Sequence, residues 1–182
     1  MDEGDPAKGY RGSFSESMSE YGQDHTMNAE QEASLRLLRA AVNPEIPDDV
    51  ETAVCAAYEA GLHTDFVPSF IHLLSLDWHT RHEDITLALQ ELKDPRAVEV
   101  LSVTALREFP YLDYDEFRGL ARKCTWALAD IGTPEAKQKL QELSASGDPL
   151  IAQYAQKRLD RWHHELHRKN GGQDGGGDPA PA

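Results

Sequence analysis

The stretch ALADIGTPEAKQKLQEL, from Ala127 to Leu143, decides the fold of this chain. Its apolar residues recur every three or four positions on both sides of Gly132-Thr133-Pro134, which predicts two amphipathic helices. A glycine can end a helix in the left-handed conformation, and a threonine side chain can cap the next helix. Proline fits the first helical position because its missing N–H needs no partner there. The stretch therefore predicts two helices joined by a very short turn.

The same pattern occurs earlier in the chain. The segment TLALQELKDPRAVEVL (Thr86–Leu101) aligns without a gap to TWALADIGTPEAKQKL (Thr125–Leu140), at an offset of 39 residues. A weaker copy in LIAQYAQKRL has an offset of 28, and an insertion over Arg107–Glu116 explains the difference. The identical pairs are Thr86/Thr125, Ala88/Ala127, Leu89/Leu128, Pro95/Pro134, Ala97/Ala136 and Leu101/Leu140.

These copies predict an all-α fold. A two-helix unit cannot bury its apolar face alone, so successive units must stack, and alanines at matching positions let the helices approach closely. No run alternates with period two, so we expect no sheet. We predict an α-solenoid of stacked antiparallel helical hairpins with about seven to nine helices. Pro95 and Pro149 should begin further helices, and Gly147, like Gly132, should end one in the left-handed conformation.

The stretch ARKCTWALADIGTPEAKQKLQELSASGDPLIAQYAQKRL resembles the HEAT repeat, in particular the short bacterial form associated with phycobilisome lyases. The resemblance extends over about His82–Leu159 and implies the fold, not the activity. Proteins of this kind are mostly scaffolds and binding surfaces. Some are bilin lyases, some are adaptors of enzymes, and some resemble immunity proteins that block toxins.

The composition divides the chain into three parts and indicates which classes of partner it could bind. Residues 1–27 and the Gly/Pro-rich residues 170–182 contain too few apolar side chains to offset the entropy of ordering, so we expect both to be disordered. Residues 28–169 form the expected repeat domain. The net charge of -14 and the pI near 4.9 disfavour nucleic acid as a partner and suit another protein, including a basic one.

The sequence also gives expectations about the cellular location of the protein and about enzymatic activity. There is no signal peptide and no apolar run of membrane-spanning length, so we expect a cytoplasmic protein without a membrane partner. The two cysteines, Cys55 and Cys124, stand in apolar helical surroundings, and we expect both to be buried. No nucleotide-binding or hydrolase motif is present, so we expect no cofactor and no enzymatic activity.

Two histidine clusters are candidates for metal binding. His79 and His82 with Glu83 lie in WHTRHED, and His163 and His167 share a helix face. Zinc sites need three or four convergent ligands, which neither cluster supplies by itself, so we predict no metal site. The simpler interpretation of WHTRHED is a helix start at which the acidic residues favour the positive end of the dipole.

The insertion EFPYLDYDEF (Glu108–Phe117) is the candidate binding site. It interleaves aromatic and acidic residues, and long loops between repeats often carry recognition. The alternative is that the aromatic side chains pack beneath the loop and that Asp115 or Glu116 begins the next helix. The residues predicted to bind a partner are Phe109, Tyr111, Asp113, Tyr114, Asp115 and Glu116.

The function that these features favour is a non-catalytic protein–protein interaction module. It could be a scaffold, an adaptor or an immunity-type protein that neutralises a toxin, in line with the acidic charge. The alternative is a bilin lyase-like enzyme or chaperone of the phycobilisome-lyase group.

Overall fold

The computed structural model describes residues 26–42 and 47–163. Within these ranges the chain is entirely helical, with eight α-helices, three short 3₁₀ helices and no strand, as the sequence predicts. The predicted disordered segments, 1–27 and 170–182, lie outside the described residues apart from Thr26 and Met27. The helices are α1 (Ala29–Ala40), α2 (Pro47–Glu59), η1 (Thr64–Phe66), α3 (Val67–Ser75), α4 (His82–Leu92), η2 (Pro95–Ala97), α5 (Val98–Leu106), η3 (Pro110–Leu112), α6 (Gly119–Ile131), α7 (Pro134–Ser144) and α8 (Pro149–Asp160).

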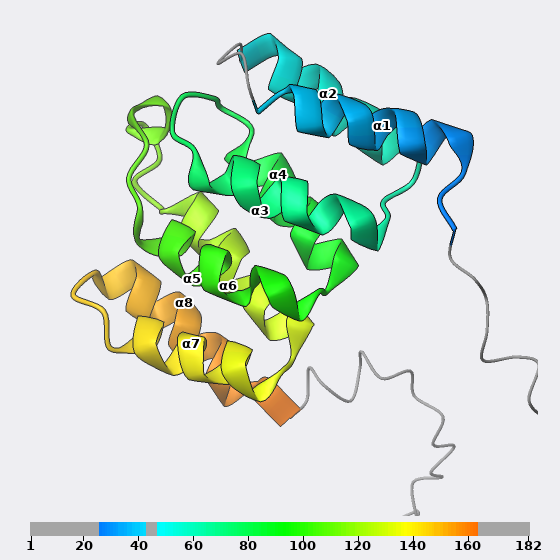
Figure 1. Ribbon diagram of the computed structural model, residues 1–182. Helices are drawn as coiled ribbons and strands as arrows, with labels where there is room; N and C mark the ends of the chain where they lie inside the picture. Colours follow the sequence, from blue (N-terminus) through cyan, green and yellow to red (C-terminus); the bar gives the residue numbers. More distant parts are fainter. Residues whose placement is uncertain (1–25, 43–46, 164–182) are drawn as a thin grey trace, which may run out of the picture.

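The helices form two layers. Helices α1, α3, α5 and α7 contact one another in sequence in one layer, and α2, α4, α6 and α8 do so in the other. Four antiparallel hairpins, from α1–α2 at the top of Figure 1 to α7–α8 at the bottom, therefore stack into a short α-solenoid. The connections 76–81, 107–118 and 145–148 all lie at the left edge of this view.

Capping residues set most of the helix starts. Thr133 accepts a hydrogen bond from the backbone N–H of Ala136 and so begins α7, and Asp148 begins α8 by accepting from two N–H groups. Asp94 accepts a hydrogen bond from the backbone N–H of Arg96 and so caps the helical segment that begins at Pro95. This segment starts as the 3₁₀ helix η2 and continues as α5. The predicted starts at the three prolines are confirmed.

The helix ends agree with the sequence in part. Gly132 ends α6 in the left-handed conformation with φ of 72°, as predicted. The same prediction for Gly147 is wrong, because the last turn of α7 closes through the hydrogen bond from Ser146 N–H to the Leu143 carbonyl, at 3.1 Å. At the position equivalent to Gly132, Lys93 takes the left-handed conformation with φ of 52°.

A continuous apolar seam joins the hairpins. Ala88 and Ala127 are both fully buried, so the alanines do lie between neighbouring helices. The prediction for the cysteines is half right. Cys124 is buried within α6, whereas Cys55 is exposed, because it lies on the outward face of α2. None of the helices in the described part of the chain is long and apolar enough to cross a bilayer.

Candidate functional site

The connection 107–118 between α5 and α6 contains all six residues predicted to bind a partner. The structure divides them. Phe109, at the start of the loop, is 3% exposed, whereas Tyr114, near its middle, is 81% exposed. The loop therefore has an inner half that packs on the solenoid and an outer half that faces solvent.

Phe109 anchors the inner half. Its ring centroid lies 3.9 Å from that of His82, at the start of α4, and the guanidinium of Arg107 lies 4.6 Å from the same ring. Arg107 also donates hydrogen bonds to the carbonyls of Leu74 (3.2 Å) and Ser75 (2.9 Å) at the end of α3. The beginning of the loop is thus fastened to the preceding hairpin by an aromatic contact and a cation.

Tyr111 extends this attachment through a hydrogen bond. Nε2 of His82 lies 2.7 Å from the Leu76 carbonyl, which can only accept, so Nε2 carries the proton of the neutral ring. Nδ1 is then an acceptor, and it receives the hydroxyl of Tyr111 at 2.9 Å. Burial lowers the pKa of His82 to about 4 and raises the pKa of Tyr111 to about 12, so both groups are neutral at pH 7.

His79 is hydrogen-bonded in the same way and stacks on His82 at 4.2 Å between ring centroids. Its Nε2 lies 2.8 Å from the Leu73 carbonyl, and its Nδ1 accepts from the backbone N–H of Arg81. Burial lowers its pKa as well. All four ring nitrogens are used within the fold, which leaves none for a metal. No three His, Cys, Asp or Glu side chains converge as a ligand set in residues 26–42 and 47–163, and His167 lies outside these ranges.

Asp115 shapes the turn into α6. Its carboxylate accepts hydrogen bonds from the backbone N–H groups of Phe117 (3.1 Å) and Gly119. A Cβ on Gly119 would lie 2.7 Å from an oxygen of the same carboxylate, so a larger residue there would require the Asp115 side chain to move. Arg118, between them, is left-handed with φ of 51°. Neither Asp115 nor Glu116 begins the next helix, because α6 starts at Gly119, but Asp115 does accept a hydrogen bond from the N–H of that first residue.

Arg118 connects the loop to the following hairpin. Its Nη1 pairs with Glu108 at 3.2 Å, and its Nε pairs with Asp148, the cap of α8, at 3.0 Å. The ion pair between Arg118 and Asp148 fixes the loop to the following hairpin, and the contacts of Phe109 and Tyr111 fix it to the preceding one.

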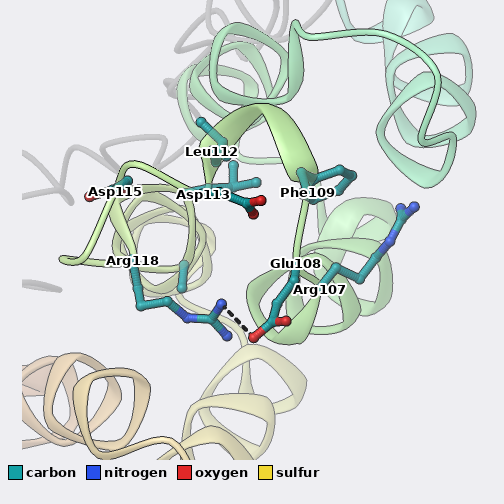
Figure 2. A pocket seen from close by; sticks show the side chains of 9 residues that line it. Arg107, Glu108, Phe109, Leu112, Asp113, Asp115 and Arg118 are labelled. Atoms are coloured by element: carbon teal, nitrogen blue, oxygen red, sulfur yellow. Dashed lines mark hydrogen bonds and ion pairs between the residues drawn. The ribbon is translucent and has the colours of Figure 1, made fainter.

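A pocket of about 240 Å³ lies between the loop and the start of α6 (Figure 2). Phe109 and Asp113 stand on one side, and the ion pair between Arg118 and Glu108, drawn as a dashed line, closes another. The guanidinium of Arg107 points away from this space. The lining residues are Arg107, Glu108, Phe109, Leu112, Asp113, Asp115, Arg118, Leu120 and Ala121.

The outer half of the loop is polar and aromatic. Asp113, Tyr114 and Glu116 are exposed, and so is Phe117, at 71%. The Phe117 carbonyl accepts a hydrogen bond from the hydroxyl of Tyr154 on α8, at 2.7 Å, which fixes the backbone of the loop at this residue. The Phe117 ring itself does not pack into the core. Phe117 is not among the residues that the sequence predicts to bind a partner, and it lies in the loop because α6 begins two residues later, at Gly119.

The comparisons with known proteins agree with this architecture. The model of the PBS lyase HEAT-like repeat matches residues 120–146, which span α6 and α7. This match covers one helix pair, and together with the stacked hairpins it supports a HEAT-like repeat architecture. No curated protein and no solved structure matches the chain significantly.

Proposed function

We propose that this chain is a non-catalytic protein–protein interaction module and that the outer half of the 107–118 loop is its docking surface. The observation that carries the proposal is the exposure of Tyr114 and Phe117, at 81% and 71%. Large aromatic side chains are enriched at the energetic centres of protein interfaces, where they fill pockets of the partner.

The held backbone supports this function. Asp115 accepts from two backbone N–H groups, Tyr154 donates to the Phe117 carbonyl, and the inner half of the loop packs against His82. A loop that is already fixed loses little conformational entropy when it binds, so more of the contact energy appears as affinity.

The charge of the loop indicates the kind of partner. Asp113 and Glu116 are exposed beside the aromatic residues, and Glu108 is largely exposed as well. Acidic groups around an apolar centre favour a basic protein and accelerate its association. One specific form of this function is an immunity-type protein that neutralises a basic toxin, for which a toxin reading frame beside the gene would be supporting evidence.

The same observations disfavour a lyase. No nucleophilic Ser, Cys or Lys lines the pocket under the loop. Burial raises the pKa of the Cys124 thiol to about 12, which keeps it protonated and unreactive. Cys55 is exposed on α2 and is not among the residues that line the pocket under the loop.

The test is a quantitative affinity purification from the native cell. The bait is the wild-type chain, the double variant Tyr114→Ala with Phe117→Ala, or the control Leu37→Ala, which removes an exposed apolar side chain from α1 instead. We expect the double variant to reduce capture of one specific protein by at least about tenfold, because two interface anchors are lost. The control should capture this protein at the wild-type level.

Two results would contradict the proposal. One is equal capture of every protein by the double variant and by the wild-type chain. The other is a large loss of thermal stability in the double variant, which would mean that the two aromatic residues act in packing. We expect its melting temperature to stay close to that of the wild-type chain, because exposed side chains contribute little to stability.

A further inference from the structure

A second hollow, separate from the loop pocket, lies between the outward faces of α6 and α8 and has a volume of about 320 Å³. Its lining is basic and aromatic, with no acidic residue among the side chains that form it. We call it the α6/α8 groove. The residues that line it are Arg122, Lys123, Thr125, Trp126, Tyr154, Lys157 and Arg158.

This basic character opposes the charge of the whole chain. Residues 1–117 contain eight basic and 24 acidic side chains, whereas residues 118–169 contain ten basic and six acidic ones. The net charge of -14 therefore conceals a positive C-terminal part, and the α6/α8 groove gathers four of its cations.

The cations differ in how they are held. Lys123 pairs with Glu83 of α4 at 3.3 Å, and the guanidinium of Arg158, only 3% exposed as a residue, lies 3.6 Å from the ring centroid of Trp126. Arg122 and Lys157 are exposed and make no ion pair with another residue of the described ranges. The groove thus combines a buried cation–aromatic pair, Arg158 and Trp126, with two exposed cations, Arg122 and Lys157, that a ligand can reach.

The helix dipole does not account for Arg122 and Lys123 of α6. At the 39-residue offset, Arg122 and Lys123 correspond to Glu83 and Asp84, the acidic residues in the first turn of α4. Because α6 begins at Gly119, Arg122 and Lys123 are its fourth and fifth residues, and the helix dipole does not favour basic side chains in this half of a helix. The dipole therefore does not explain why α6 carries two basic residues at these positions, although Lys123 does pair with Glu83 of α4.

We propose that the α6/α8 groove binds an acidic, Asp- or Glu-rich segment of another protein. Guanidinium groups match carboxylates in geometry, and the face of Trp126 offers apolar area to the methylene groups of glutamate. A volume of about 320 Å³ accommodates a few side chains. A long nucleic acid would have to pass over the acidic remainder of the molecule, which favours a short carboxylate-bearing ligand over a phosphate backbone. The proposal is independent of the loop, whose exposed acids suit a ligand of opposite charge.

The test is fluorescence anisotropy with a labelled Glu-rich peptide at low ionic strength and the full chain as binder. The probe variant is Arg122→Glu with Lys157→Glu, and the matched control is Arg36→Glu with Arg39→Glu on α1, which changes the net charge equally. We expect the groove variant to weaken binding at least about tenfold and the control less than about twofold, because close charges act more strongly than screened distant ones. The milder variant Arg122→Gln with Lys157→Gln should give an intermediate loss, and circular dichroism should show all variants folded.

Three outcomes would overturn the proposal. The first is equal binding of a peptide with glutamine in place of glutamate. The second is an equal loss in the control variant, which would make the effect one of overall charge. The third is tighter binding of a single-stranded oligonucleotide than of the acidic peptide, which would assign the groove to nucleic acid.

Discussion

The unit formed by α4 and α5 and the unit formed by α6 and α7 share their buried residues but differ at their surfaces. Five pairs of identical residues at the 39-residue offset are almost completely buried in both copies, from Thr86/Thr125 to Leu101/Leu140. At exposed positions the two units diverge, and Glu83-Asp84 is replaced by Arg122-Lys123. The buried identities account for the common fold, and the differing surface is where each unit can acquire its own ligand.

The first prediction tests whether the shared core contributes equally in both units. Leu89→Ala and Leu128→Ala each remove a fully buried side chain at equivalent positions. We expect each variant to lower the free energy of unfolding by about 3 kcal/mol, through lost burial and the cavity that remains. Urea denaturation measures this, and Leu87→Ala, at a position 43% exposed, should change stability by less than about 1 kcal/mol. A much smaller cost at Leu89 would mean that the two cores are not equivalent.

The second prediction concerns a difference between the units, since His82 corresponds to Ala121. The unfolded chain binds a proton at His82 below about pH 6.5, but the folded chain does so only near pH 4. The unfolded state therefore binds more protons in this window, and stability must fall as the pH decreases through it. We expect a loss of about 2 kcal/mol near pH 5 from this group.

Urea denaturation at pH 7 and near pH 5 measures this loss. His82→Gln should reduce the pH dependence relative to the wild-type chain, because it removes the buried titrating ring. Identical pH profiles for the wild-type chain and His82→Gln would show that the ring does not titrate as its burial requires.

The third prediction uses the two left-handed helix ends. Gly132→Ala places a Cβ at φ of 72° and should destabilise the chain by about 1 kcal/mol. Lys93→Gly relieves the same strain at the equivalent position and should stabilise it by about 0.5–1 kcal/mol. Thermal or urea unfolding of both variants gives the signs, and equal signs would contradict the correspondence between the two positions.

The fourth prediction has the smallest effect on stability and separates the two cysteines. A thiol reagent such as a maleimide should modify Cys55 rapidly in the folded chain, because it is exposed. Cys124, whose counterpart in α4 is the buried Ile85, should react only after unfolding. Mass spectrometry should therefore find one modified thiol per native chain and two in denaturant. Two modified thiols in the native chain would mean that α6 opens readily.

The sequence predicts the regular parts of this protein well because those parts depend on local rules. Proline after a capping residue and apolar residues every three or four positions fix the start and the buried face of α7 and α8. The left-handed Lys93 is visible only by alignment with Gly132, since lysine has no preference for that conformation. Gly147 shows the converse, a glycine whose presence does not imply a left-handed helix end.

The candidate site is less predictable because a loop has no periodicity. Phe109 and Tyr114 are both aromatic residues in the same segment, yet one is buried and the other exposed. The difference depends on His82, 27 residues before Phe109, and no local pattern indicates that contact. The change from Glu83-Asp84 to Arg122-Lys123, by contrast, could have been predicted by applying the 39-residue offset to the charged positions, but the contribution of α8 to the groove could not.

The attachment of the 107–118 loop has a mechanical consequence. Through Arg107 and Tyr111 the loop reaches the end of α3 and the start of α4, and through Arg118 it reaches Asp148 ahead of α8. A stretching force along the stack would ordinarily separate neighbouring hairpins one interface at a time. Here the loop bridges three successive hairpins, so the α3–α4, α5–α6 and α7–α8 hairpins must separate together unless the contacts of the loop break first.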